Sequence, residues 1–421
     1  MHSPDAVTAT GRHTRGLRWR PTSRPSTGTG ATRAGRSRSA RAGDHALGSP
    51  SITVRSPHAG PADERTDDLM STTPDDDSVL LHRDGRVGRL VLNRPRSINA
   101  LTHPMVRALD GALAAWEQDP SVSAVVLSGA GERGLCAGGD IRAIRKDVLA
   151  GGSGAQDFWG DEYRLNARIA RYPKPYVAAM DGIVMGGGVG VSAHGGIRVV
   201  TERSLVAMPE VAIGFVPDVG GTWLLARAPG ELGTHLALTA GRMGPGDALL
   251  CGFADHVVPA ERLGDFLASL AETEPQQAVA EFAVAAPEAA LAVHREWIDS
   301  CYAADSVEEI VERLRSCGVP EAKEAADLVL DHSPTALKAT LAALRRARSL
   351  TSLEQALDQE YRVACALAAA SPDFAEGVRA LVVDKDRSPR WSPRTLEEVE
   401  PGDVERLFAP LGEGELGLAE G

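Results

Sequence analysis

Two acidic residues stand close together in a glycine-rich stretch of this 421-residue chain and could do acid–base or nucleophilic chemistry. Glu210 and Asp218 each follow a proline in MPEVAIGFVPDVGG, and the fixed φ of proline limits the backbone beside them. Two carboxyl groups in one partly dry pocket push their pKa values apart, so that one stays ionised while the other holds or donates a proton. The structural alternative is that Glu210 ends a strand and Asp218 begins the helix in VGGTWLLAR.

Two glycine clusters at the ends of predicted strands are candidate binding loops. They occur in GLCAGGDIRAIR and in MGGGVGVSAHGG, where glycine lets the backbone approach a ligand closely or adopt a positive φ. Close packing of the chain is the alternative for either cluster. The second cluster does not fit a dinucleotide-binding motif, because the third glycine would fall at Val191. The sequence also contains neither a Walker A motif nor a GxSxG elbow.

The segments around these loops alternate between strands and helices, which predicts an α/β fold. VLLHRDGRVGRLVLNRP predicts a hairpin around Asp84-Gly85, and residues 102–118 form an amphipathic helix with Thr102 as its N-cap. SAVVLSGAG and KPYVAAM predict strands that lead into the two glycine clusters. Beyond Gly233 the pattern becomes helical. The amphipathic segments there lie near 306–316, 334–348 and 353–369.

The composition excludes several classes of partner. With 57 acidic residues against 45 Lys and Arg, the chain offers no broad basic face for a nucleic-acid backbone. No stretch reaches the roughly 18 apolar residues of a membrane span, so we expect neither nucleic-acid nor membrane binding. The five cysteines lie far apart without zinc spacing, which indicates a reducing, cytoplasmic location and no metal site.

Residues 1–69 differ from the rest of the chain. They contain 11 Arg, no Lys and 6 acidic residues, and they are rich in Ser, Thr, Gly and Pro. Such a segment buries too little apolar surface to offset its chain entropy, so we predict a disordered leader over 1–76. One explanation is an organelle transit peptide, which would place the protein in the mitochondrial matrix; we favour translation from Met70. We further expect a catalytic core over 77–275 and a helical C-terminal region over 276–421.

Four motifs resemble those of the crotonase superfamily of enoyl-CoA hydratases and isomerases. In chain order they are NAL (99–101), CAGGDI (136–141), MGGGVG (185–190) and MPEVAIGFVPDVGG (208–221). The resemblance implies a crotonase-like (ClpP/crotonase) spiral α/β fold with a helical C-terminal region. It also implies that the backbone amides of Gly139 and Gly187 form an oxyanion hole around a thioester carbonyl, where fixed donors stabilise developing negative charge.

The carboxylates distinguish members of this superfamily. Hydratases similar to this chain use two glutamates, and the first of those positions is Gly190 here, which cannot activate a water. The second is retained as Glu210, and a further acid, Asp218, follows it. This arrangement resembles the 3-hydroxyisobutyryl-CoA hydrolase family, as do the later segments SCYAADSVEEI, SPTALK, EYR and FAEGVRALVVDKDRSPRW. The resemblance implies hydrolysis of 3-hydroxyisobutyryl-CoA in valine breakdown, with an enoyl-CoA hydratase or isomerase as the alternative.

The same resemblance implies roles for individual residues. Glu210 would attack the thioester carbonyl or activate the attacking water. Asp218 would orient the substrate hydroxyl or the hydrolytic water and help proton transfer. Glu162 in DEYRLN would contact the 3-hydroxyl, or else be a charge on a solvated helix face. The remaining positions that match substrate-binding residues are Arg96, Ala100, Leu101, Ala137, Asp140 and Ile141.

Other polar residues near the loops have simpler interpretations. His194 in SAHGG is expected to make a buried hydrogen bond rather than to act in catalysis, and Cys136 is expected to be a small packed residue. Lys385 and Arg387 are candidates for contacts with the CoA phosphates. The resemblance implies a small-molecule acyl-CoA substrate, with no cofactor beyond its CoA and no metal; assembly into a homo-oligomer stays open. The non-enzymatic alternative is an acyl-CoA-binding protein with a vestigial site, against which the retained acid pair speaks.

Overall fold

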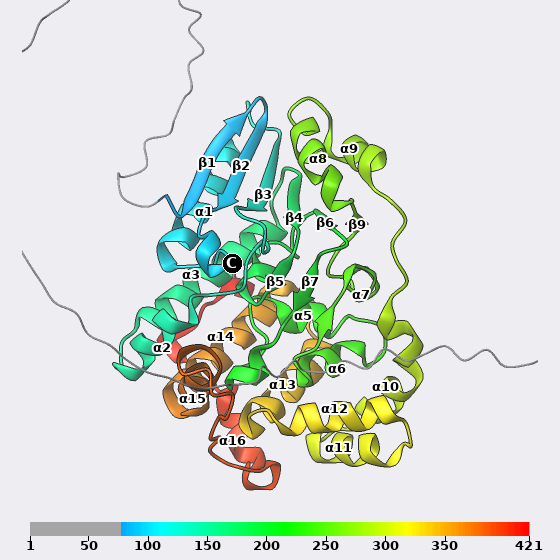
Figure 1. The fold of residues 1–421 in the computed structure, drawn as a ribbon. Coiled ribbons are helices and arrows are strands. Elements are labelled where there is room, and N and C mark those ends of the chain that lie inside the picture. The colour runs from blue at the N-terminus through cyan, green and yellow to red at the C-terminus, as the bar shows by residue number, and fades with distance from the viewer. Residues whose placement is uncertain (1–76, 421) are drawn as a thin grey trace, which may run out of the picture. The chain divides into compact units, whose positions relative to one another are not determined.

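The computed structural model describes residues 77–420 of the chain (Figure 1). The predicted leader over residues 1–76, with both explanations for it, lies outside the described residues. Between residues 77 and 420, no helix is both long and apolar enough to cross a membrane.

The main sheet begins with the predicted hairpin. β1 (Val79–Asp84) and β2 (Val87–Leu92) pair antiparallel across a turn in which Gly85 has a φ of 57°. The further strands are β3 (Ala124–Gly129), β4 (Tyr176–Met180), β6 (Ile197–Val200) and β9 (His256–Val257). They continue the sheet in parallel in the order β1-β2-β3-β4-β6-β9 (Figure 1). Every residue of β4 is buried, as expected for a central parallel strand with both faces covered.

A smaller sheet brings the two glycine clusters together. Its strands are β5 (Ile183–Met185), β7 (Leu205–Ala207) and β8 (Arg242–Met243). Cys136 forms a parallel bridge with Val184 of β5, and Gly134 forms an antiparallel bridge with Gly182. Because β5 leads directly into α4 (Gly187–Gly190), this pairing lays the first glycine cluster beside the second.

Three helices follow the first strands. α1 (His103–Gln118) matches the predicted helix, and the Thr102 side chain accepts a hydrogen bond from the Met105 amide. α2 (Ile141–Leu149) begins directly after the first glycine cluster, with Asp140 as its N-cap. α3 (Gly154–Ala170) packs against α1 and turns a buried face toward α4.

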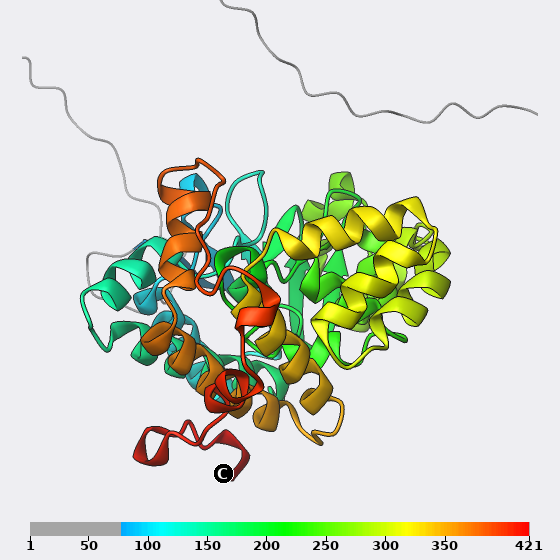
Figure 2. The ribbon, with the colours of Figure 1, turned by 90° about the horizontal axis from the view of Figure 1, so that it is seen from below.

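The C-terminal region is helical, as predicted, and its helices gather below the two sheets in the view of Figure 1. The predicted amphipathic segments correspond to α11 (Val307–Ser316), α13 (Pro334–Ala347) and α14 (Leu353–Ala370). Each of these helices has a serine N-cap whose hydroxyl accepts a backbone N–H, which explains where each one begins. The other helices are α10 (Arg295–Tyr302), α12 (Pro320–Leu330), α15 (Asp373–Val378) and α16 (Pro401–Leu407). Seen from below, the yellow to red part of the chain runs across the molecule (Figure 2).

One hydrophobic core joins the first and last parts of the described chain. Leu90 of β2, Val184 of β5, Leu357 of α14 and Phe374 of α15 belong to the same buried cluster. The expected boundary between residues 275 and 276 stays a prediction, and this core extends across it. The remaining α-helices of the described chain, which alternate in part with β8 and β9, are α5 (Gly221–Leu225), α6 (Leu232–Leu238), α7 (Pro245–Leu250), α8 (Leu263–Ser269) and α9 (Pro275–Phe282).

Candidate active site

The amides of Gly139 and Gly187 lie close together at the meeting point of the two glycine clusters. A Cβ atom on Gly187 would lie 3.3 Å from the Gly139 amide nitrogen. Leu101 bonds to the backbone on either side of Gly139: its amide donates to the Gly138 carbonyl, and its carbonyl accepts from the Asp140 amide. In the described part of the chain, neither the Gly139 amide nor the Gly187 amide donates a hydrogen bond to a protein acceptor. Two adjacent unused donors could together bind one oxygen atom that gains negative charge.

Two predicted carboxylates lie beside the second glycine cluster, and the third, Asp218, lies close enough to both to repel them. Glu162 comes from α3, Glu210 begins the 3-10 helix η2 (Glu210–Ile213), and Asp218 follows in the same loop. Glu162 Oε1 lies 2.5 Å from the position of a Cβ on Gly187, and Glu210 Oε1 lies 2.9 Å from that on Gly186. All three residues are at most 7% exposed. The alternative of a solvated helix-face charge at Glu162 is therefore wrong, because Glu162 belongs to the buried face of α3.

Asp218 is held by a residue that the sequence did not single out. The Tyr163 hydroxyl donates a hydrogen bond of 2.8 Å to Asp218 Oδ2, and both side chains are buried. Tyr163 directly follows Glu162 on α3, so one helix supplies both groups. Only its place in DEYRLN, beside a suspected substrate contact, could have signalled it.

The three carboxyls are difficult to ionise where they lie. Burial, followed by repulsion from the Asp218 carboxylate, raises the pKa of Glu162 and that of Glu210 well above the usual range. Burial raises the pKa of Asp218 to about 7, although the hydrogen bond from Tyr163 favours its ionised form. No Lys, Arg or His among residues 77–420 forms an ion pair with any of the three.

Two oxygens in this cluster lack any hydrogen-bond partner within the described residues. They are Glu162 Oε1 and Glu210 Oε2, and both are buried. Buried polar atoms are nearly always paired in folded proteins, so unpaired ones indicate atoms that contact a ligand or water. The cluster thus combines unpaired acceptors, a carboxyl that titrates near neutral pH and two unused amide donors.

Gly190 is enclosed by the loop that carries Asp218. A Cβ at this position would lie 2.7 Å from the Val219 Cβ and 2.9 Å from Asn166 Nδ2, closer than real side chains approach. The sequence predicts that the hydratase glutamate is missing here. The structure adds that a larger side chain has no room. Asn166 is itself fully buried, and both polar atoms of its amide are unpaired within the described chain; the sequence did not single it out.

A fourth buried carboxylate comes from the C-terminal region. Glu360 of α14 is 1% exposed, and burial, opposed by hydrogen bonds from Thr222 and Gly220, raises its pKa to about 8. It lies in the segment EYR, which the sequence connected with a family but not with the site. No local pattern could reveal it, because its contacts are with residues far earlier in the chain.

The remaining predicted substrate-binding positions lie on one stretch of paired backbone, in which residues 94–101 run beside residues 136–141. The Ala137 amide donates to the Ile98 carbonyl, and Arg94 bonds to Asp140 Oδ2 at 3.0 Å. These bonds hold 94–101 against 136–141. The predicted residues in this stretch are the exposed Arg96 and Ala137, the half-buried Ala100, Asp140 and Ile141, and the buried Leu101. Lys385 and Arg387 lie instead in an exposed turn after η5 (Arg379–Val383), where both have a positive φ.

His194 and Cys136 have the structural roles expected of them. His194 Nε2 lies 2.8 Å from the Val219 carbonyl oxygen, and burial lowers the pKa of the ring to about 4. Cys136 is completely buried, which raises the pKa of its thiol to about 12. Neither group is ready for catalysis at neutral pH. Among residues 77–420, no three His, Cys, Asp or Glu side chains are grouped so that they could hold a metal ion.

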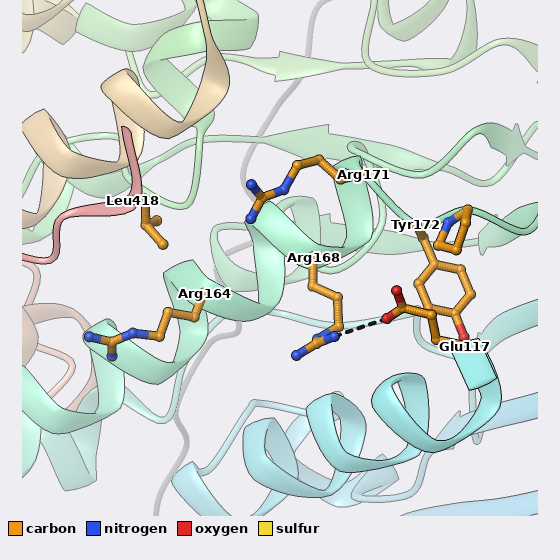
Figure 3. Close-up of a pocket in the computed structure, with 7 residues that line it drawn as sticks. Glu117, Arg164, Arg168, Arg171, Tyr172 and Leu418 are labelled. Atoms are coloured by element: carbon orange, nitrogen blue, oxygen red, sulfur yellow. Dashed lines mark hydrogen bonds and ion pairs between the residues drawn. The ribbon is translucent and has the colours of Figure 1, made fainter. Parts of the chain in front are cut away.

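A separate surface pocket of about 390 Å³ lies on the outward face of α3 (Figure 3). Figure 3 shows Arg164, Arg168 and Arg171 on this face, with Arg168 directed toward Glu117 of α1. Arg168 also bonds to Asp110 of α1 at 2.6 Å. The predicted site residues are all elsewhere, so this pocket is not part of the carboxylate cluster.

Several known proteins are similar to this chain. A family model described as enoyl-CoA hydratase/isomerase matches residues 87–408. A protein named 3-hydroxyisobutyryl-CoA hydrolase, mitochondrial, from Gallus gallus is 42% identical over 351 residues, which are 81% of this chain and 91% of that protein. The Homo sapiens protein of the same name is 42% identical over 351 residues, covering 81% and 90% respectively. Both relatives are named as mitochondrial, which does not support the expected cytoplasmic location.

Two crystal structures have the same fold. One, described as a carnitinyl-CoA dehydratase from Mycobacterium thermoresistibile, has a TM-score of 0.79 and 54% identity, and the match covers 81% of this chain and 98% of that one. The other, described as an enoyl-CoA hydratase from Rhodobacter sphaeroides 2.4.1, has a TM-score of 0.76 and 46% identity over 80% and 99% of the two chains. These matches confirm the predicted crotonase-like fold with its helical C-terminal region. The chain therefore belongs to the enoyl-CoA hydratase/isomerase (crotonase) family.

Proposed function

We propose that this chain hydrolyses the thioester of 3-hydroxyisobutyryl-CoA to 3-hydroxyisobutyrate and CoA. The observation that carries the proposal is the position of Glu210 at the glycine cluster that holds an unused backbone amide, with Asp218 buried near Glu210 and no acid at Gly190. The names of the Gallus gallus and Homo sapiens relatives support the same substrate. Both names include the word mitochondrial, which supports that compartment rather than the cytoplasm. A place in valine breakdown is part of the same proposal.

The oxyanion is held by the main chain in this proposal. The thioester oxygen accepts hydrogen bonds from the amides of Gly139 and Gly187, which have no other acceptor within the described residues. As the carbonyl carbon becomes tetrahedral, the oxygen gains charge and both bonds strengthen. Removing one such donor from other enzymes raises the barrier by about 2.7–4 kcal/mol.

Glu210 starts the reaction by one of two routes. In the first, the deprotonated Glu210 carboxylate, which its raised pKa makes a stronger nucleophile, forms a bond to the carbonyl carbon; the C–S bond breaks, and the thiolate leaves and takes up a proton. Water then hydrolyses the resulting anhydride and restores the carboxylate. In the second, Glu210 takes a proton from the attacking water, and the departing sulfur is protonated. Either route consumes one water and releases one carboxylic acid and one thiol.

Asp218 transfers the proton, and Glu162 binds the substrate hydroxyl. Because the pKa of Asp218 is raised to about 7, this group can both take up and release a proton near neutral pH. The unpaired Glu162 Oε1 is an acceptor for the 3-hydroxyl group. The stretches 94–101 and 136–141 lie along the CoA portion, and no cofactor beyond that CoA takes part.

Hydration of an enoyl-CoA is the competing function, because the two similar crystal structures are described as a dehydratase and a hydratase. The surroundings of Gly190 argue against it. A glutamate side chain at that position would overlap Val219 and Asn166. The water-activating acid of the hydratases is therefore missing, and the side chains around Gly190 leave no room for one.

A direct assay compares two reactions of the purified protein after dialysis against EDTA. We expect rapid release of free thiol from 3-hydroxyisobutyryl-CoA and no measurable hydration of crotonyl-CoA. Hydration without thiol release would refute the proposal. Binding of both thioesters without turnover would favour the non-enzymatic acyl-CoA-binding protein. Multiple turnovers in ¹⁸O-water then separate the two routes, since only the anhydride route puts ¹⁸O into the Glu210 carboxylate.

A further inference from the structure

The loop that carries Asp218 contains a valine, Val219, in the left-handed backbone conformation that valine does not favour. Val219 has a φ of 51°, and Gly220 follows with a φ of 79°. A β-branched residue at positive φ is strained, by about 1–3 kcal/mol, and persists only when its surroundings hold it. The position of the Asp218 carboxylate therefore depends on contacts outside the loop.

Glu360 supplies such contacts from the C-terminal region. Its Oε2 accepts the Gly220 amide at 2.6 Å, and its Oε1 accepts the Thr222 amide at 2.9 Å and the Thr222 hydroxyl at 2.5 Å. These donors are the second and fourth residues after Asp218, and Glu360 lies 140 residues beyond Gly220 in the chain. The Glu360 carboxylate thus caps the start of α5. The structural alternative considered for Asp218, that it begins this helix, assigned that role to the wrong carboxylate.

His194 holds the opposite side of the same peptide segment. Because burial lowers the pKa of His194 to about 4, the ring is neutral at pH 7 and carries one proton. The Val219 carbonyl can only accept, so that proton lies on Nε2 and is donated over 2.8 Å. The carbonyl of Val219 and the amide of Gly220, which belong to one peptide unit, are each held by a separate side chain.

We propose that Glu360 is a positioning residue that fixes the Asp218 loop in its active conformation, so that the helical C-terminal region completes the catalytic site. The inference rests on the proposed hydrolysis. A carboxylate suits this role because both oxygens must accept: the partners are two backbone N–H groups and one hydroxyl. A glutamine would turn an N–H₂ group toward one of these donors and lose that bond.

Asp358 provides a matched control on the same helix. It is also buried, at 7% exposed, and its oxygens accept the amides of Leu418 and Ala419 at 2.9 and 3.0 Å. These amides belong to the C-terminal end of the described chain and not to the Asp218 loop. Glu360→Gln and Asp358→Asn therefore remove similar bonds from one helix, and only the first touches the site.

The experiment measures kcat and KM for thiol release across pH in the wild type and both variants. We expect Glu360→Gln to lower kcat roughly 10- to 100-fold with little change in KM, since a small displacement of a catalytic group has effects of this size. Asp358→Asn should stay within about twofold of the wild type. We also expect the acidic limb of the kcat profile to move to lower pH in Glu360→Gln, because repulsion from Glu360 is one of the causes that raise the pKa of Glu210. Burial and repulsion from Asp218 and Glu162 still raise that pKa, so the limb moves without disappearing.

Unchanged kcat and an unchanged pH profile in folded Glu360→Gln would overturn the inference, as would an equal loss in Asp358→Asn. If Glu360→Gln does not fold, Glu360→Asp replaces it: that variant keeps both acceptors but withdraws them, and normal kcat there would be equally contradictory. A wild type that releases no thiol would refute the proposed function alone. Hydrogen exchange at the Gly220 and Thr222 amides would then test the positioning, with faster exchange expected in Glu360→Gln than in Asp358→Asn.

Discussion

Helix α3 carries charged groups on two faces, and these groups differ in their exposure to solvent and in whether they have a partner of opposite charge. The outward face holds Arg168, which lines the pocket of Figure 3 and pairs with Asp110 and Glu117 of α1. The inward face holds Glu162, which is 2% exposed, has no cation beside it within the described residues, and keeps one oxygen unpaired. The helix is the same, so the difference comes from what each face meets.

The difference separates charges that serve the fold from charges that serve the reaction. Paired surface charges lower each other's energy modestly and perturb the chemistry little. Buried carboxylates without partners raise the energy of the folded protein, and they persist because a substrate needs them. The unpaired face therefore marks the site. The paired face, although it lines a sizeable pocket, does not.

The largest effect should come from the unpaired face. We expect Glu210→Gln to lower kcat for thiol release roughly 10³-fold, because the variant can neither attack the carbonyl nor accept a proton. The melting temperature should not fall, since a buried unpaired carboxyl is removed. Stopped-flow thiol release and calorimetry test both parts. Normal turnover, or a collapse of stability, would place Glu210 among the charges that hold the fold.

Gly190 tests whether the inward face depends on close packing behind it. Gly190→Ala places a methyl group 2.7 Å from the Val219 Cβ, so the Asp218 loop must move. We expect kcat to fall about 10-fold or more and the free energy of unfolding to fall by about 1–3 kcal/mol. Gly196→Ala is the matched control, because a Cβ there meets nothing within 4 Å. Equal behaviour of the two variants in urea unfolding and in the thiol assay would contradict the packing interpretation.

Asp218→Asn tests whether a buried, unpaired carboxyl lowers the free energy of unfolding at neutral and higher pH. The pKa of Asp218 is raised by burial to about 7 from an ordinary value of 3.8, so the folded state binds more protons than the unfolded state between these values. Asp218 therefore makes the free energy of unfolding decrease as pH rises from about 4 to 7, by on the order of a few kcal/mol. Asp218→Asn should remove this decrease and be more stable than the wild type at pH 8, although inactive.

The paired Asp255 gives the opposite sign as a control for that experiment. Burial alone would raise its pKa, but hydrogen bonds from Arg198 lower it below the ordinary value. Its contribution to stability is present above pH 4 and is lost as pH falls through the lowered pKa. Asp255→Asn should consequently be less stable than the wild type at pH 8. Urea unfolding of both variants at pH 5 and pH 8 measures the contrast; the same sign in both would contradict it.

The smallest effect is expected on the outward face of α3. Arg168→Met removes two ion pairs whose side chains are 31–39% exposed, so the free energy of unfolding should change by less than about 1 kcal/mol. Turnover should be unchanged. A drop in kcat comparable to that of Gly190→Ala would mean that the pocket of Figure 3 communicates with the site.

Local signals in the sequence predicted local structure well. The Asp84-Gly85 turn, the Thr102 cap and the three amphipathic segments of the C-terminal region are present as predicted, because each depends on residues a few positions apart. The motif resemblance also named Gly139, Gly187 and the acids that the fold brings together. The interpretation of Glu162 as a solvated charge was wrong, because the residues near it in the sequence do not show which face of the helix the rest of the chain covers.

The residues that could not be found from the sequence contact partners that are far away along the chain. Tyr163 bonds to a carboxyl 55 positions later, and Glu360 bonds to an amide 140 positions earlier. The steric reason for Gly190 appears only when Val219 and Asn166 are in place around it. Two-residue strands such as β8 and β9 carry no periodicity from which they could be predicted.

The distance between Gly220 and Glu360 along the chain has a consequence for biosynthesis. At roughly 5–20 residues per second, a ribosome needs about 7–28 s to add the 140 residues that separate them. During that interval the nascent loop lacks the acceptor that satisfies its amides, and non-local contacts of this kind form slowly even afterwards. The working centre is therefore complete only after α14 has left the exit tunnel.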